Sequence, residues 1–139
     1  MPEPSSSAQQ ALVQLDVYQR QLEVAARQVE LLQNALDEAV RAKRSLEALD
    51  EEKSNEILLP LGASTFLRGS VANRDVAITG IGAGYATERP RAKAIELLAE
   101  REKSLRDETD QMMQAAFQIQ QEIARLQELV DGGDAGDAE

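Results

Sequence analysis

The glycine-rich segment Gly80-Ile81-Gly82-Ala83-Gly84 is the part of this sequence whose residue types and spacing come nearest to a known chemistry. Glycine-rich loops bind phosphate when their backbone N–H groups lie at the N-terminus of a following helix. Here the spacing is GxGxG, no Walker-type lysine follows, and Tyr85 opens a strand-like segment instead of a helix. A tight turn between two strands explains the glycines better. We therefore predict no cofactor-binding site.

Other groups that support catalysis or metal binding are sparse. The sequence has no cysteine and no histidine, which excludes thiol nucleophiles, histidine acid–base catalysis and zinc sites with Cys or His ligands. Acidic clusters occur at Asp50-Glu51-Glu52 and at Asp107-Glu108 with Asp110. Carboxylates without a loop geometry make a poor cation site, so we interpret them as solvated helix faces. The sequence predicts a protein that is not an enzyme, with no catalytic residue and no metal ligand.

The charge balance limits the class of partner. The formal net charge is −10, which disfavours nucleic acid and anionic lipid as partners. No run of about 18 apolar residues is present, and the first residues lack the features of a signal peptide, so we expect no membrane partner. The absence of cysteine is compatible with a cytoplasmic location, which is our expectation. Only four of the 15 basic residues are lysines. An acidic excess with few lysines suits a salt-rich cytosol, and a salt-adapted source is our hypothesis.

A first long segment has the periodicity of a coiled coil. Between Ser5 and Leu59 there is no glycine and no proline. Its apolar residues alternate at spacings of three and four, at Ala8, Ala11, Leu15, Tyr18, Leu22, Ala25, Val29, Leu32, Leu36 and Ala39. Lys43 and Asp50 then occupy the seam positions. The apolar residues shift to Ala42, Leu46 and Leu49, which predicts a register slip.

A second segment has the same character. It extends from Arg91 to Asp131, with Pro90 at its start. Its clearest seam positions are Met112, Ala116, Ile119, Ile123, Leu126 and Val130. We expect Gly132-Gly133 to end this helix and the acidic tail 132–139 to be disordered. The two segments have similar lengths and are expected to fold back on each other, which places Leu46 near Leu98, Leu32 near Met112 and Leu15 near Leu129.

The middle of the chain changes to strand-like patterns. Four short strands are expected at 57–61, 65–72, 76–81 and 85–88, separated by turns at 62–64, 72–75 and 82–84. Two β-hairpins result. Small isolated sheets are marginally stable in water and their edges need covering or pairing. We therefore expect other subunits to complete this region, and the protein to be an oligomer.

These patterns predict a fold that is mainly α with a small β region. It is an antiparallel α-helical coiled-coil hairpin with two β-hairpins at its base. We expect a single domain over 1–139. Its parts are an N-terminal helical arm at 5–55, a double β-hairpin assembly region at 56–88, a C-terminal helical arm at 90–131 and the acidic tail.

Two segments in the middle of the chain resemble a known family. Leu58-Leu59-Pro60-Leu61-Gly62-Ala63-Ser64-Thr65-Phe66-Leu67 resembles the "LVPVGAGSF" type segment of prefoldin alpha subunits of the archaeal type. The segment from Gly80 to Arg89, GIGAGYATER, resembles the "VGSGYAVER" type segment of the same family. The second hairpin indicates the alpha class, since beta subunits carry one hairpin. Ser64 departs from the more usual glycine at that position.

The resemblance implies an assembly and an activity. It implies a hexamer of two alpha and four beta subunits, with a double β-barrel body built by the hairpins. It also implies an ATP-independent chaperone of the holdase type, which binds unfolded client proteins at its coiled-coil tips and passes them to a group II chaperonin. The residues that this places in the assembly interface are Leu59, Leu61, Phe66, Leu67, Val71, Val76, Ile78 and Ile81. The residues placed at the client-binding tips are Leu12, Val13, Leu15, Ile123, Leu126, Leu129 and Val130.

Two interpretations of the arms stay open in the sequence. The uncharged segments 5–15 and 111–121, the latter with Met112 and Phe117, are either ordinary seam or an adaptable binding surface. Correspondingly, the alternative to a chaperone subunit is a structural or tethering coiled-coil subunit without client binding. An accessory subunit of an enzyme is a further alternative.

Overall fold

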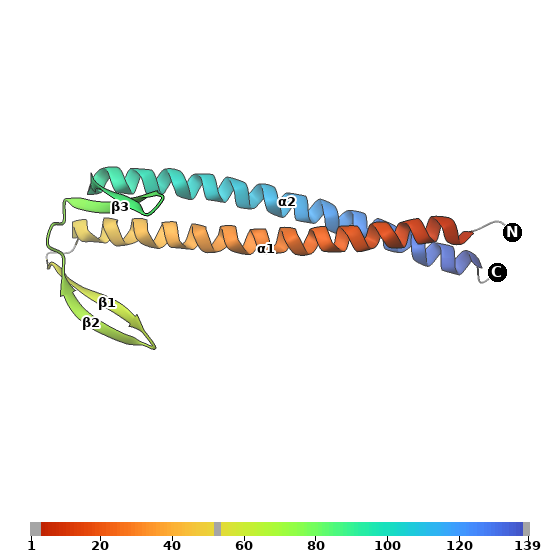
Figure 1. Cartoon of the computed structure of the whole chain (residues 1–139), viewed down its shortest axis with the longest axis horizontal. Coiled ribbons are helices and arrows are strands. Elements are labelled where there is room, and N and C mark those ends of the chain that lie inside the picture. Colours follow the sequence, from red (N-terminus) through yellow and green to blue (C-terminus); the bar gives the residue numbers. More distant parts are fainter. Residues whose placement is uncertain (1–3, 52–53, 138–139) are drawn as a thin grey trace. The chain divides into compact units, whose positions relative to one another are not determined.

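The computed structural model describes residues 4–51 and 54–137, with side chains described between Ser7 and Gly132. The elements follow one another as helix α1 (Pro4–Glu51), strands β1 (Glu56–Gly62), β2 (Thr65–Ser70), β3 (Val76–Gly82) and β4 (Tyr85–Pro90), and helix α2 (Arg91–Asp137) (Figure 1). The predicted fold of two long helices with two β-hairpins between them is confirmed.

The helix ends differ in detail from the sequence prediction. Helix α1 begins at Pro4, so the following serines lie inside its first turn. Proline suits this position because the first helical N–H has no intrahelical partner. Helix α2 continues through Gly132-Gly133 to Asp137, where the sequence predicted an end. Glycine in a helix costs about 1 kcal/mol relative to alanine but blocks nothing sterically, and no proline follows. The tail predicted to be disordered over 132–139 is therefore helical as far as Asp137, and 138–139 lie outside the described residues.

The chain divides into two compact units. The first contains Met1–Asn34 with Leu105–Glu139, and the second contains Ala35–Ser104. Each long helix contributes to both units. The first unit therefore holds only helix, whereas the second holds both hairpins with the adjoining parts of α1 and α2.

The core of the first unit is an antiparallel helix seam. Ala11 and Leu15 of α1 form a buried cluster with Ile123 and Leu126 of α2. Four half-buried side chains pack against this cluster, from Tyr18, Leu22, Ile119 and Val130. The seam positions predicted for both helices in this unit are buried or half-buried, which confirms the heptad pattern there.

In the second unit the seam of α1 keeps its register through Leu46, so the predicted slip comes one turn later than expected. Ala42, predicted in the seam, is exposed, whereas Lys43 is half-buried and pairs with Glu102 of α2, with 2.5 Å between Nζ and Oε2. Leu46 and Leu49 are half-buried as predicted, and the exposed Asp50 pairs with Arg91. The spacing of three and four thus continues through Lys43, because an ion pair lets a charged side chain occupy a position that otherwise takes an apolar one.

The seam of α2 also contains polar residues that the apolar pattern did not reveal. Glu102 is half-buried, and Thr109 is buried with only 5% of its surface exposed. The Thr109 hydroxyl donates to the carbonyl of Leu105 at 2.6 Å, which satisfies it within its own helix. Extending the spacing of three and four backward from Met112 leads to both residues. The early part of the α2 seam therefore keeps the spacing of three and four residues, and it differs from the later part in containing polar side chains.

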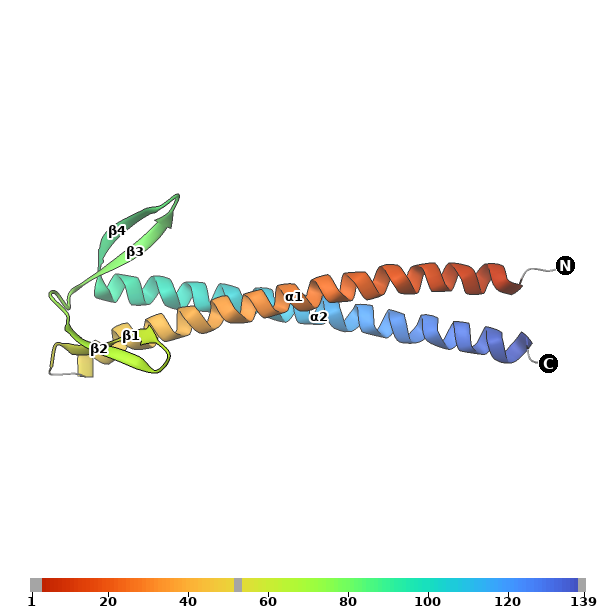
Figure 2. The same ribbon diagram turned by 60° about the horizontal axis from the view of Figure 1, so that its bottom comes forward.

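The two hairpins are separate two-stranded antiparallel sheets (Figure 2). Strand β1 pairs with β2 from Glu56 opposite Ser70, and β3 pairs with β4 from Val76 opposite Pro90. Both ladders shift register just before the turn, at Pro60/Gly62 and at Gly80/Gly82. A bulge of this kind bends the strand and increases its twist.

The two turns share one backbone conformation but not one sequence. In the first, Ala63 and Ser64 have φ of 50° and 58°, and in the second Ala83 and Gly84 have φ of 54° and 80°. Positive φ at both central residues is typical of a type I′ turn, which matches the twist of the flanking strands. Gly84 adopts this conformation freely, whereas Ser64 does so against its Cβ. The serine noted in the sequence thus changes the strain of the turn and not its geometry.

Candidate interaction surfaces

The hairpins carry large apolar side chains that their own chain does not cover. Of the eight residues predicted in the assembly interface, six are exposed, and they are Leu59, Leu61, Phe66, Leu67, Ile78 and Ile81. Val71 and Val76 are half-buried. Leu58 and Tyr85 are equally exposed and were missed, although the same alternation of apolar residues includes both. Exposed apolar groups at this density mark a surface for interaction with another protein.

The first hairpin is apolar on both faces. Opposed residues of an antiparallel pair lie on the same face of the sheet. Leu59 opposite Leu67 forms one face, and Leu58, with Phe66 diagonally across the ladder, lies on the other. A sheet that faces water on one side has polar residues on that side. In β1 and β2 large apolar side chains stand on both faces, although the face of Leu58 and Phe66 also carries Glu56, Arg68 and Ser70.

Gly69 shows how closely the side chains of one face pack. A Cβ at this position would lie 3.0 Å from Cδ1 of Leu59 and 3.8 Å from Cγ1 of Ile57. The glycine therefore makes room for the two apolar side chains of β1 across the ladder. A substitution to alanine would require the end of the Leu59 side chain to shift by a few tenths of an ångström.

Arg91, at the start of α2, makes hydrogen bonds to two other segments of the second unit. Its Nε donates to the carbonyl of Arg74 at 2.8 Å and its Nη1 to the carbonyl of Leu46 at 3.0 Å, while Nη2 donates to the carboxylate of Asp50. Its backbone N–H donates to the carbonyl of Asp75 at 2.8 Å. One side chain at the start of α2 thus holds both the end of α1 and the connection between the hairpins.

The ion pair between Arg91 and Asp50 shifts the pKa of both side chains. The hydrogen bond from the guanidinium lowers the pKa of Asp50 below its ordinary value of 3.8, against a smaller opposing effect of desolvation. The same hydrogen bond raises the pKa of Arg91. Both groups are therefore charged at neutral pH, and the contact is a charge-assisted one.

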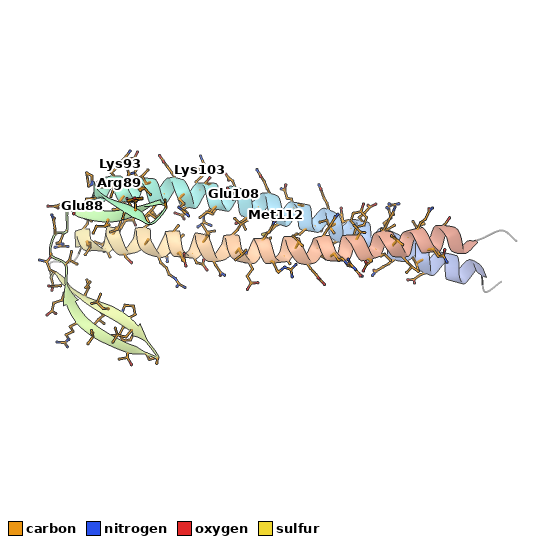
Figure 3. The ribbon with its side chains drawn as sticks, viewed as in Figure 1. Glu88, Arg89, Lys93, Lys103, Glu108 and Met112 are labelled. Carbon is orange, nitrogen blue, oxygen red and sulfur yellow. The ribbon has the colours of Figure 1, made fainter. Side chains whose placement is uncertain are left out.

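The second hairpin lies against the helices of its unit. Ala77, Thr79 and Arg89 line a pocket together with residues of both helices, among them Ala39 and Ala94. Nε of Arg89 donates to the Thr79 hydroxyl at 3.1 Å across the ladder. Figure 3 labels Glu88 and Arg89 on β4. The polar face of this hairpin thus turns to its own helices, and Ile78 is left exposed.

The seven residues predicted at the client-binding tips divide into two groups. Leu15, Ile123 and Leu126 are buried in the seam, with 8%, 9% and 2% of their surface exposed, and Val130 packs against them. Leu12, Val13 and Leu129 are exposed, at 53%, 65% and 55%. The first group holds the two helices together. Only the second group is open to another protein while the helices stay paired.

A further set of exposed apolar residues in the first unit was not predicted. Val17, Val24 and Leu31 of α1 recur every seven residues beside the seam. Val17 and Val24 line a shallow groove with Met112, Ala115 and Ile119 of α2, and Met112 is labelled in Figure 3. This seven-residue spacing is present in the sequence, but the neighbouring seam residues follow the same heptad period, so these three were not recognised as a separate surface.

The segment 111–121, which the sequence left open as either seam or binding surface, contains both kinds of residue. Phe117 and Met113 are exposed, whereas Met112 is half-buried in the seam. The segment therefore contains seam residues and surface residues side by side. Its exposed part belongs with the apolar surface of the first unit.

Within 4–51 and 54–137, no three carboxylate side chains gather closely enough to hold a metal ion. No helix in the described part of the chain is both long and apolar enough to cross a membrane.

Known proteins share this architecture and sequence. The family model "Prefoldin subunit" matches residues 18–132. The prefoldin subunit alpha of Methanobrevibacter smithii is 31% identical over 117 residues, which are 84% of this chain and 80% of that protein. The prefoldin subunit alpha of Pyrococcus horikoshii is 30% identical over 128 residues, 91% of this chain and 86% of that protein.

A solved structure agrees with the fold. The filamentous prefoldin of Methanocaldococcus jannaschii, determined by cryo-electron microscopy, aligns with a TM-score of 0.65 at 18% identity. The alignment covers 81% of this chain and 93% of that chain. With the matched family model and two alpha subunits at about 30% identity, the chain belongs to the prefoldin family of chaperone subunits.

Proposed function

We propose that this chain is an alpha-type subunit of an ATP-independent holdase chaperone. It binds unfolded proteins at the ends of its helix pair and delivers them to a group II chaperonin in the cytoplasm. The observation that supports this most strongly is the set of uncovered apolar side chains on both hairpins. A lone chain would expose this surface to water, so the hairpins favour assembly with other subunits.

The proposed assembly is a hexamer of two alpha-type and four beta-type chains. Two-stranded hairpins are marginally stable alone, and the first hairpin is apolar on both faces. Several helix pairs would then act together on one client. Weak contacts at each pair add up through effective concentration, so tight binding needs no energy input.

The assembly interface can be tested by placing a charge in it. Phe66→Asp and Ile78→Asp are expected to abolish the hexamer, because the carboxylate would be buried without a partner. Ser70→Asp, on an exposed strand end, is the control and should leave assembly intact. Hexamers of normal mass from both Phe66→Asp and Ile78→Asp would refute the proposed interface.

The client-binding site is proposed at Leu12, Val13 and Leu129. They are exposed, unlike Leu15 and Leu126, whose replacement would remove core side chains at about 2–5 kcal/mol each and open the seam. The triple variant with serine at the three exposed positions should therefore assemble normally. It should suppress the aggregation of an unfolded model protein several-fold less well than the wild type.

The matched control for this experiment is Leu31→Ser. Leu31 is an exposed leucine of the same unit, and its replacement tests whether any loss of surface apolarity has the same effect. Aggregation suppression by the assembled triple variant equal to that of wild type would exclude these residues as the binding site.

A tethering subunit without client binding is the second candidate. The burial of Leu15, Ile123 and Leu126 favours it, because these residues are then explained by helix pairing alone. The two candidates differ in one measurable property. A tether assembles with partner subunits but leaves the aggregation of unfolded proteins unchanged at every concentration of the complex.

A further inference from the structure

The two hairpins have the same construction, and each position of the second is numbered 20 above its equivalent in the first. Leu58 lies opposite Arg68 in the first ladder, and Ile78 lies opposite Glu88 in the second. Both ladders shift register at the same place, just before turns of the same conformation. A side chain of the first hairpin can therefore be compared directly with its equivalent in the second.

Arg68 and Glu88 occupy equivalent positions and carry opposite charges. Both are exposed. Each lies on one face of its ladder beside a large apolar side chain directly across from it, because opposed residues of an antiparallel pair share a face. These apolar neighbours are Leu58 and Ile78, with 63% and 73% of their surface exposed. Each hairpin thus presents an uncovered apolar group and a charged group side by side.

Neither charge has a partner of opposite sign within the described part of the chain. No ion pair or side-chain hydrogen bond of Arg68 or Glu88 occurs there. Glu56 shares the face of Arg68, one position along the ladder on that face, but the two do not pair. The charge on each hairpin is therefore available to a group of another chain.

The proposed assembly makes a partner for each charge necessary. A subunit that covers Leu58 or Ile78 also removes water from the charged group across the ladder. A charge that loses water without gaining an opposite charge is strongly unfavourable. The neighbour of Arg68 must then supply a carboxylate, and the neighbour of Glu88 must supply a cation.

A second copy of this chain supplies both. When the first hairpin of one copy meets the second hairpin of the other, Arg68 faces Glu88 of the second copy. A twofold axis repeats this contact, since the interface of a symmetric pair is self-complementary. The other arrangement joins equivalent hairpins and places Arg68 against Arg68 and Glu88 against Glu88. Like charges placed together repel, so the charges favour the first arrangement.

We propose that Arg68 and Glu88 form two symmetric ion pairs between two copies of this chain. The pairs determine which hairpin of one copy meets which hairpin of the other. They act by admitting opposite charges and by excluding the arrangement that joins equivalent hairpins. This proposal rests on the proposed assembly, which contains two copies of the chain, and it names the residues that set how the two copies face each other.

Charge reversal in two differently tagged copies tests the pairing. Both full-length copies are produced together in their own cytosol, and the readout is the fraction of one tagged copy that co-purifies with the other. Arg68→Glu in both copies, or Glu88→Arg in both copies, should reduce this fraction at least about tenfold, because each change places like charges together.

The matched controls are Arg27→Glu and Glu128→Arg. They change the net charge by the same amounts at exposed helix positions. Surface substitutions of this kind have small effects, so co-purification should stay within about twofold of wild type.

Complementation between the two variants is the deciding measurement. When one copy carries Arg68→Glu and the other carries Glu88→Arg, both contacts again join opposite charges. Co-purification should then return to within about twofold of wild type, since the two sites are coupled. The double variant should recover with itself and fail with the wild type. Recovery also shows that each variant chain folds.

The same samples keep the proposal separate from the proposed function, because partner subunits bound to the tagged chains are identified by mass. Normal co-purification of either single variant with itself, or no recovery in the mixture of the two, would overturn the ion pairs. If partner subunits are still bound in those samples, the proposed function stands. A wild-type chain that binds neither partner subunits nor its second copy contradicts both.

Discussion

Ser64 and Gly84 occupy equivalent positions in the two hairpin turns, and they differ in what the backbone demands of them. Both have positive φ, at 58° and 80°. A side chain in this left-handed region costs on the order of 1 kcal/mol, while glycine accepts it freely. The first turn therefore carries this strain at both central residues, Ala63 and Ser64, whereas the second carries it only at Ala83.

Replacing Ser64 by glycine should stabilise the first hairpin by about 1 kcal/mol, or about fivefold in its local opening equilibrium. Amide exchange at Leu59 and Leu67 in the isolated chain should slow by that factor. Gly84→Ser is the reciprocal variant and should speed exchange in the second hairpin. Faster exchange in Ser64→Gly would show that the turn is not strained.

Arg91 makes three side-chain hydrogen bonds to separate parts of the second unit, so its loss should be felt more than that of an ordinary surface arginine. Arg91→Ala should lower the melting temperature of the chain clearly more than Arg125→Ala. Arg125 is the matched control because, among the described residues, it pairs with Glu122 one turn away on the same helix. Equal melting temperatures of the two variants would contradict the fastening role.

The titration of Asp50 gives this contact a pH dependence. Its pKa is lowered in the folded chain, so the contact contributes stability above the ordinary pKa of 3.8 and loses it as the pH falls through the lowered value. The difference in melting temperature between wild type and Asp50→Asn should therefore be largest near neutral pH and vanish in stronger acid. A difference of the same size at pH 7 and at pH 2 would exclude the ion pair as its cause.

At the scale of elements, the helix seam shows how far periodicity alone predicts a fold. The apolar residues gave the seam positions of the first unit correctly, but Leu15, predicted near Leu129, clusters with Ile123 and Leu126, and Leu129 is exposed. The pattern failed at Lys43, Glu102 and Thr109, because an apolar template assigns polar residues to the surface. Their partners lie on another helix or one turn back, and a one-dimensional pattern does not contain that information.

The pair of Lys43 and Glu102 is a seam contact with 23% and 16% of the two side chains exposed. Lys43→Leu or Glu102→Leu alone should cost about 1–3 kcal/mol in the free energy of unfolding, since one charge is left half-buried. The double variant should recover most of this loss, because two leucines pack as at other seam positions. Chemical denaturation of the four chains measures the coupling, and strictly additive effects would contradict a direct pair.

At the scale of the whole molecule, the sequence indicated two hairpins that need partners, and the structure adds which side chains are uncovered. The hairpins themselves were predictable because strands alternate and turns carry glycine, whereas the assembly role of their exposed apolar residues stays a prediction. The tip residues were less so, since Leu12 and Leu15 look alike in the sequence and differ only in which side of α1 faces α2. The choice of proposed client-binding residues therefore depends on geometry more than on residue type.

The mass and composition of the native complex test the central claim most directly. The tagged chain would be isolated from its own cytosol under native conditions, sized by light scattering and analysed by mass spectrometry. The account predicts a complex of about six small chains, in which a second coiled-coil protein is about twice as abundant as this one. A chain recovered alone, as a simple dimer, or bound to one large unrelated protein would contradict it.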